Sequence, residues 1–260
     1  MGAIQKEVVS FKGVDKIYNT GTVALSQLDL SIQEGEFISF LGPSGCGKST
    51  ALRMVAGLGE ATKGKVEVFG QNPKDLIRNS NDIAYVFQDS NLLPWRTVLD
   101  NVVLPLELRG SNKNTRKEIA MRVLEMVGLK DYLKSYPRQL SGGMKMRVSI
   151  ARALAAKPKL LLMDEPFAAL DEMTRQSLQM DLLDIWKKEH TTILFVTHNV
   201  YEAVYLSSKI AVMSARPGRL ASLIDVDLSY PRDRVNSAFT EYVDLASRSL
   251  EHSLNRKELV

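Results

Sequence analysis

Apolar and polar positions alternate along this chain in two different ways, and together they predict an α/β protein with a helical block inserted in it. Strands are predicted over short apolar runs bounded by glycines and polar turns, at 8–11, 28–32, 36–41, 64–70, 83–87, 160–163, 192–196 and 210–213. Helices are predicted where apolar positions recur every three or four residues, at 48–57, 97–108, 115–127, 141–156, 171–188 and 200–206.

This order predicts the organisation of the domain. Residues 1–88 and 159–228 are expected to form an α/β core with a largely parallel sheet, which binds ligands at the carboxyl ends of its strands. Residues 89–158 are expected to form a helical subdomain, and 229–260 a polar helical tail. Thr115 and Glu118 fit a capping box, which would start the helix there.

Composition changes this picture little. The chain has 260 residues, 45% of them hydrophobic and 25% charged, with a formal net charge of +4, as in an ordinary globular protein. Its single cysteine, Cys46, excludes an internal disulfide and a cysteine metal cluster. We expect no secretory leader, because the amino terminus contains no apolar h-region, and no membrane-spanning helix, because no apolar run approaches about 18 residues.

A phosphate-binding loop stands between a predicted strand and a predicted helix. Residues 42–50 fit the pattern of a glycine-rich loop that ends in Lys and Ser. The backbone N–H groups of such a loop and of the helix start bind phosphates, while Lys48 reaches the β and γ phosphates and the Ser49 hydroxyl binds Mg²⁺. The predicted ATP-binding residues of this loop are Gly42, Pro43, Ser44, Gly45, Cys46, Gly47, Lys48, Ser49 and Thr50.

Two adjacent carboxylates follow the apolar run of residues 160–163. A carboxylate at the end of a buried strand is costly unless a cation compensates it, so Asp164 is a candidate ligand of the same Mg²⁺ as Ser49. Glu165 is the candidate base that polarises the attacking water, since phosphoryl transfer needs positioning and charge stabilisation more than covalent chemistry. The two residues predict nucleotide hydrolysis as well as binding.

A second glycine-rich turn lies shortly before the carboxylates. Ser141 is a candidate N-cap, and Gly142 and Gly143 follow it at the start of the helix predicted over 141–156. This arrangement makes a second anion-binding helix terminus. Two such sites on one subunit do not easily serve a single γ-phosphate.

The order of these motifs resembles the ATP-binding subunit of ABC transporters over about residues 5–225. The resemblance implies a RecA-like P-loop core with an antiparallel β subdomain and a helical subdomain. It further implies that Gln88 contacts Mg²⁺ and the water, that His198 contacts the γ-phosphate, and that Tyr18 stacks on adenine. For Tyr18, a position in the core or on an edge strand is the competing interpretation.

The resemblance also gives the second glycine turn a role. In the family this turn closes over ATP bound to the opposite subunit of a two-fold dimer, which implies that Ser141, Gly142, Gly143 and Asp171 act in trans. Met144 stands where most members carry Gln, so any contact through that amide is absent, and Ala168 replaces a serine that is often found there. We expect activity nonetheless.

A single nucleotide-binding domain without membrane spans favours an importer subunit that works with a separate membrane permease. Residues 91–102, 167–171 and 213–219 are similar to the nitrate, sulfonate and taurine branch, whose cargo is chosen by the permease and a substrate-binding protein. An exporter, a lipid-trafficking system or a soluble ABC ATPase are the alternatives. The resemblance implies a peripheral position at the cytoplasmic face of the membrane, a second ATP-binding subunit and no nucleic acid. Residues 92–95 either line the groove for the permease or form a buried patch.

Overall fold

The computed structural model describes residues 6–79, 82–168 and 170–255. The chain divides into two compact units, residues 1–80 with 191–260 and residues 81–190, which are described separately below. The domain borders predicted at residues 88, 158 and 228 do not coincide with these unit borders and stay a prediction, because a division by compactness need not follow function.

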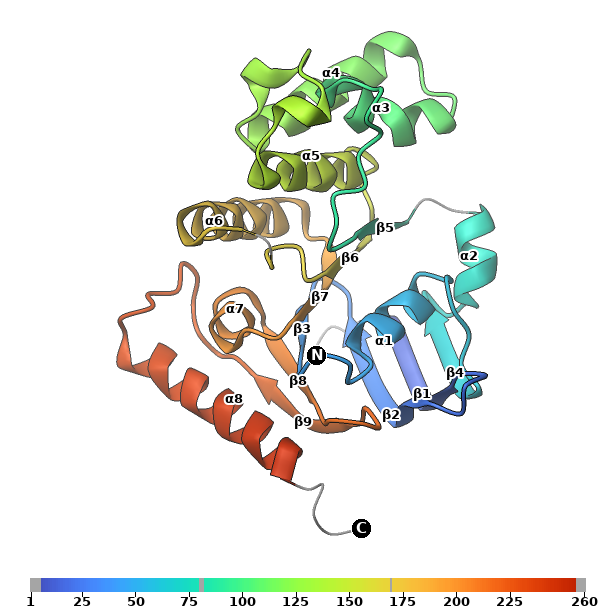
Figure 1. Cartoon of the computed structure of the whole chain (residues 1–260), viewed down its shortest axis with the longest axis vertical. Helices are drawn as coiled ribbons and strands as arrows, with labels where there is room; N and C mark the ends of the chain where they lie inside the picture. The colour runs from blue at the N-terminus through green and yellow to red at the C-terminus, as the bar shows by residue number, and fades with distance from the viewer. Residues whose placement is uncertain (1–5, 80–81, 169, 256–260) are drawn as a thin grey trace, which may run out of the picture. The chain divides into compact units, whose positions relative to one another are not determined.

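The first unit contains an antiparallel sheet. Its central strand β1 (Glu7–Ile17) pairs with β2 (Val23–Gln33) on one side and with β4 (Lys63–Val68) on the other, both antiparallel (Figure 1). Along β2 the buried positions alternate with accessible ones, as expected of a sheet with one covered face. Strands are predicted in all three regions; the predicted strands 8–11 and 28–32 are shorter than β1 and β2, while the predicted strand 64–70 extends two residues beyond β4.

The same unit contains parallel strands. The strand β3 (Phe37–Leu41) runs parallel to β7 (Thr192–Thr197) and to β8 (Lys209–Met213), while β9 (Leu220–Asp225) returns antiparallel to β8. Every residue of β3 and β7 is buried, which explains their predominantly apolar sequences. Burying one large apolar side chain of this kind stabilises the fold by about 1.5–3 kcal/mol.

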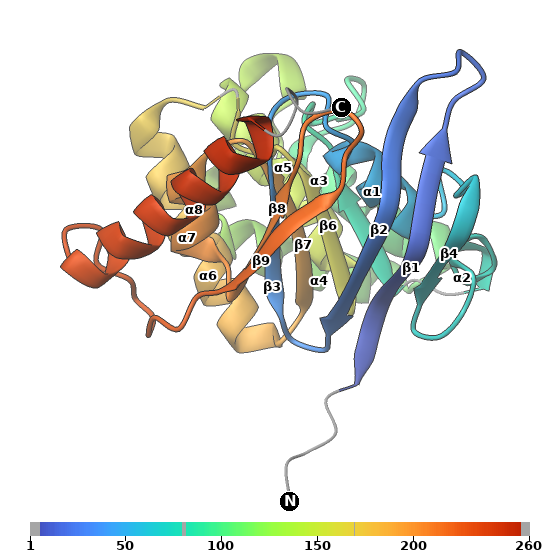
Figure 2. The ribbon, with the colours of Figure 1, turned by 90° about the horizontal axis from the view of Figure 1, so that it is seen from below.

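Four helices accompany these strands in the first unit: α1 (Lys48–Val55), α2 (Pro73–Asn79), α7 (Val200–Leu206) and α8 (Ser237–Asn255). Of these, α2 was not predicted. The tail helix α8 contacts α7, β8 and β9 and buries Phe239, Val243 and Ala246 (Figure 2). Arg232, which precedes α8, donates hydrogen bonds to the carbonyls of Val204 and Ser207 and so closes the carboxyl end of α7.

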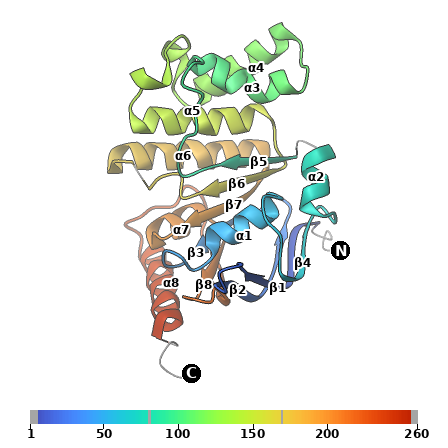
Figure 3. The ribbon, with the colours of Figure 1, turned by 45° about the vertical axis from the view of Figure 1, so that its right-hand side comes forward.

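The second unit combines two parallel strands with helices. Strand β5 (Ile83–Val86) pairs with β6 (Leu160–Asp164), and four helices belong to the unit: α3 (Val98–Leu108), α4 (Lys113–Met126), α5 (Gly142–Ala155) and α6 (Glu172–Glu189) (Figure 3). Two short 3₁₀ helices, Lys130–Tyr132 and Pro137–Gln139, connect α4 to α5. Helices α3, α4 and α5 pack on one another. The α/β core, the antiparallel sheet and the helical subdomain are thus those predicted.

The capping box predicted at Thr115 is wrong. Helix α4 begins two residues earlier, and its cap is Asn112, whose side chain accepts a hydrogen bond from the N–H of Asn114. Thr115 therefore lies within the first turn, because the Asn side chain already satisfies the helix end. In the ranges that the structure describes, no helix combines the length and the apolar character that crossing a membrane requires.

Candidate nucleotide-binding site

The loop of residues 42–50 connects β3 to α1 and is built for a close approach of backbone. Helix α1 starts after Gly47, which has a φ of 96° and provides no side-chain cap, and the start of a helix attracts anions. A Cβ at Gly47 would lie 2.6 Å from the carbonyl oxygen of Ala24. Both the conformation and the contact therefore require glycine here.

Lys48 lies within this loop rather than in solvent. Its side chain is buried, and its Nζ donates hydrogen bonds to the carbonyl oxygens of Gly42 at 2.7 Å and Pro43 at 2.9 Å. A charged amine held by carbonyls at the start of a glycine loop is positioned to bind an anion in the same loop.

Tyr18 is brought to the phosphate loop. It follows β1, its side chain is 41% exposed, and its hydroxyl lies 3.1 Å from Oγ1 of Thr50. The interpretation of Tyr18 as a core residue is therefore wrong. An exposed ring fixed beside the first turn of α1 suits stacking on a base.

His198 leaves the sheet beside the phosphate loop. Leu41 and Thr197, the last residues of β3 and β7, are partners in the parallel register, so the two following loops start at the same edge. Thr197 donates a hydrogen bond of 2.6 Å to Glu202, and the Asn199 side chain caps α7. His198 is thus exposed on a turn that is fixed on both sides.

Gln88, Asp164 and Glu165 lie together in the second unit. Val86 and Met163 are register partners, so the residues that follow β5 and β6 emerge at one edge of this strand pair. Asp164 is 8% exposed, and its Oδ2 accepts a hydrogen bond of 3.0 Å from the Tyr85 hydroxyl. Gln88 is exposed.

Glu165 has an unusual backbone. Its φ is 45°, in the left-handed region that costs a residue with a Cβ about 1 kcal/mol or more. Such conformations persist only where the surrounding structure imposes them, and they cluster at functional sites. This backbone turns the Glu165 side chain away from the path that a continuing strand would give it.

The second glycine turn and Asp171 are brought together by a single threonine. The Ser141 hydroxyl accepts a hydrogen bond of 3.3 Å from the N–H of Met144, which confirms the predicted cap of α5. Asp171 caps α6 in the same way by accepting a 3.0 Å bond from the N–H of Thr174, and this bond holds the pKa of the Asp171 carboxyl below its usual value. The methyl group of Thr174 would lie 2.6 Å from a Cβ at Gly143. Both helix starts are thereby fixed against each other.

The two glycines of this turn should respond differently to substitution. Gly143→Ala forces a methyl group against Thr174 and should lower the free energy of unfolding by about 1–3 kcal/mol. Gly142→Ala is the matched control, because nothing lies within 4 Å of its Cβ position. Thermal unfolding of both variants checks the contrast. Equal melting temperatures would contradict the packing of α5 on α6 described here.

Two residues that the sequence analysis did not single out hold the segment after Gln88. Arg152 of α5 donates hydrogen bonds to the carbonyl oxygens of Ser90 and Asn91, both at 2.9 Å. Asn101 is completely buried in α3, donates to the carbonyls of Leu93, Arg96 and Thr97, and accepts from the N–H of Leu93. Of the two, only Asn101 could have been noticed in the sequence, as a polar residue within an apolar helix pattern.

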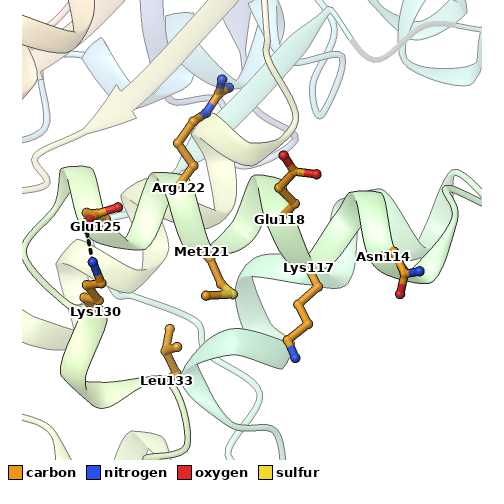
Figure 4. Close-up of a pocket in the computed structure, with 8 residues that line it drawn as sticks. All are labelled: Asn114, Lys117, Glu118, Met121, Arg122, Glu125, Lys130 and Leu133. Atoms are coloured by element: carbon orange, nitrogen blue, oxygen red, sulfur yellow. Dashed lines mark hydrogen bonds and ion pairs between the residues drawn. The ribbon is translucent and has the colours of Figure 1, made fainter.

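The segment fixed in this way presents Trp95, whose side chain is 72% exposed, so for this residue the buried-patch alternative is wrong. Beside α3 and α5 runs a groove of about 550 Å³, lined among others by Tyr85, Leu108 and Arg152. A second hollow of about 430 Å³ lies on α4, with the ion pair of Lys130 and Glu125 at one end (Figure 4). That second hollow contains none of the predicted site residues.

The site residues therefore fall into two groups, one in each unit. The phosphate loop, Tyr18 and His198 lie in the first unit, and Gln88, Asp164, Glu165, Asp171 and the turn of residues 141–143 lie in the second. A glycine-rich loop between a buried parallel strand and an uncapped helix defines a P-loop nucleotide-binding protein.

Comparison with known proteins makes this class more specific. Residues 25–168 match the model of the family described as ABC transporter. The chain is 52% identical over 219 residues to an uncharacterized ABC transporter ATP-binding protein of Methanocaldococcus jannaschii, covering 84% of this chain and 81% of the relative. It is 41% identical over 247 residues to the aliphatic sulfonates import ATP-binding protein SsuB of Bacillus thuringiensis, covering 94% and 96%.

A solved structure agrees with these relatives. An ATP-binding cassette captured as a dimer in a post-hydrolysis state, bound to ADP and Pi, superposes with a TM-score of 0.77 at 35% identity, covering 85% of this chain and all of that one. The chain belongs to the ABC transporter family. It is the ATP-binding subunit of such a transporter and an ATPase, and the predicted cassette fold is confirmed.

Proposed function

We propose that this subunit pairs with a second copy and uses ATP hydrolysis to energise the uptake of a small oxyanion through a separate membrane permease. The observation that carries the importer assignment is the 41% identity, over nearly the whole of both chains, to a protein named as an aliphatic sulfonates import ATP-binding protein. Three further features support the proposal: the composition of the site, its second glycine turn and its exposed apolar surface.

We expect the nucleotide to be bound by the phosphate loop and by polar residues that follow the parallel strands. The phosphate loop supplies N–H groups and Lys48 for the phosphates, and Tyr18 supplies a stacking surface for adenine. Mg²⁺ would be held by the Ser49 hydroxyl, Gln88 and Asp164, oxygen donors of the kind this ion prefers. The burial of Asp164 supports this role, because a buried carboxylate gains from a nearby cation. The ion would neutralise phosphate charge, while Glu165 orients and polarises the water and His198 contacts the γ-phosphate.

The second copy would complete the site. The turn at the start of α5 is exposed and open: Ser141 and Gly142 are exposed, and nothing occupies the space beside Gly142. An exposed helix terminus attracts the phosphate of another subunit, and a two-fold dimer uses each such surface twice. Asp171, fixed to the same turn through Thr174, would lie at the same interface.

The permease would contact the exposed surface of the second unit. Trp95 and Leu108 are 72% and 80% exposed, and large aromatic side chains are enriched at protein interfaces. The segment that carries Trp95 is held by Arg152 and Asn101, so it is preorganised for a partner. Through the permease the subunit would lie at the cytoplasmic face of the membrane, and a substrate-binding protein would select the cargo.

Reconstitution with the permease tests this function. The complex, with its binding protein, is placed in vesicles, and ATP turnover and uptake are measured with an alkanesulfonate, taurine, nitrate or bicarbonate. We expect turnover to rise with one of these anions and the anion to accumulate. ATP turnover that is the same with and without the permease would favour a soluble ABC ATPase instead. Movement of solute or lipid out of the ATP-containing compartment would favour an exporter or a lipid-trafficking system.

A further inference from the structure

The hairpin turn between β8 and β9 lies directly against the phosphate loop. Leu41, the last residue before the loop, is the register partner of Val212, so the chain after β8 emerges at the same edge of the sheet as the loop itself. Gly218 of this turn donates a hydrogen bond to the Ala24 carbonyl, and a Cβ on Gly218 would lie 1.9 Å from the carbonyl oxygen of Cys46. Only glycine allows this approach.

The turn is also held in shape. The Ser214 hydroxyl donates a hydrogen bond of 3.1 Å to the Pro217 carbonyl and accepts one of 3.0 Å from the N–H of Arg219. The Gly218 carbonyl accepts a hydrogen bond from the N–H of Ser26 in β2. The backbone that carries Arg216 is therefore fixed relative to residues 42–50.

Arg216 extends its guanidinium from this turn over the phosphate loop. Its Nη2, Nε and Cζ would lie 3.1, 3.7 and 3.8 Å from a Cβ on Gly45, so the guanidinium occupies the space where a side chain of residue 45 would stand. Arg216 is exposed. Within residues 6–79, 82–168 and 170–255, no carboxylate or carbonyl forms a hydrogen bond or an ion pair with it.

We propose that Arg216 is a further cation of the nucleotide site, which attracts the phosphates of ATP from the outer side of the loop. The proposal rests on the placement of the phosphates at residues 42–50. The loop binds anions, and the guanidinium of Arg216 beside Gly45 adds positive charge where the nucleotide is most negative. The role requires a positive charge at this point rather than a particular hydrogen-bond geometry.

Calorimetric titration with ATP tests the proposal. Arg216→Ala should weaken ATP binding about three- to tenfold at low ionic strength, and high salt should remove most of the difference, because screening weakens an exposed charge. Arg216→Lys should retain most of the affinity. Arg219→Ala is the matched control: it removes the same charge from an exposed position of the same turn and should leave the affinity within about twofold of the wild type.

Two results would overturn the proposal. One is an ATP affinity of Arg216→Ala equal to that of the wild type. If this variant binds ATP normally but no longer dimerises with ATP, Arg216 belongs to the interface with a second copy, and the proposal is likewise wrong. The other is an equal loss in Arg219→Ala, which would reduce the effect to net charge. Lys48→Ala distinguishes a failure of this proposal from a failure of the proposed phosphate site. If Lys48→Ala no longer binds ATP while Arg216→Ala binds it normally, the phosphate-loop assignment is supported and only the role of Arg216 is wrong. Melting temperatures verify folding of each variant.

Discussion

Replacing Glu165 by Gln should lower ATP turnover by about 10²–10⁴-fold, the usual contribution of a general base, while ATP binding is retained. The amide has the shape of the carboxylate but cannot accept the proton of the attacking water. Because Gln also has a Cβ, the left-handed backbone at φ 45° is equally strained in both proteins, so the substitution isolates the chemistry. Turnover is measured as phosphate release, and binding by calorimetry.

This variant should also accumulate as an ATP-bound dimer, since the step that releases the two subunits is blocked. Size-exclusion chromatography with ATP checks this. Glu172→Gln serves as the control, because Glu172 lies in the exposed first turn of α6 and pairs with Arg175 at 2.8 Å. Full turnover in Glu165→Gln would remove Glu165 as the base.

Lys48→Ala should weaken ATP binding by about 10²-fold or more. A hydrogen bond to a charged group contributes about 1.5–3 kcal/mol, and the Lys48 amine is expected to make such bonds to the β and γ phosphates. Calorimetric titration with ATP measures the loss. Unchanged affinity would contradict the assignment of residues 42–50 as the phosphate loop.

The folding of this variant has to be verified, because the Lys48 amine also donates hydrogen bonds to the carbonyls of Gly42 and Pro43. Lys63→Ala removes the same charge from an exposed position of β4 and should bind ATP normally. A melting curve shows whether the Lys48→Ala loop is still folded. A variant that melts like the wild type and does not bind ATP gives the clear result.

The features that the sequence predicted best depend on local patterns. The strands that end in Leu41, Asp164 and Thr197 are buried on both faces, so their sequences are predominantly apolar and easy to recognise. The phosphate loop and the Ser141 turn are equally local, because a few adjacent residues supply the whole geometry. The start positions of helices were predicted less well. Both Asn112 and Thr115 are residue types that cap helices, and the structure uses Asn112 for α4. Helix α2 has only seven residues, too few to show a helical repeat of apolar positions.

Contacts between residues that are distant in the sequence could not be predicted. Arg152 donates hydrogen bonds to carbonyls some sixty positions away, and the guanidinium of Arg216 lies beside Gly45. No spacing rule connects residues that only the fold brings together. The proposed cargo is a different matter, because it would depend on contacts that a permease and a binding protein make.

The central claim is that each ATP is bound between two copies of the chain, by the phosphate loop of one and the Ser141 turn of the other. Two heterodimers, isolated with two affinity tags, test it with the same pair of substitutions. In the first, one subunit carries Ser141→Arg and the other Lys48→Ala, which leaves one intact composite site. In the second, one subunit carries both substitutions and the other is wild type, which leaves none.

Phosphate release by these two heterodimers is the decisive measurement. The composite site predicts turnover in the first heterodimer and only background turnover in the second. Sites that are complete within single subunits predict the reverse, because the wild-type subunit of the second heterodimer would then hydrolyse ATP alone. An active second heterodimer beside an inactive first one would contradict the account.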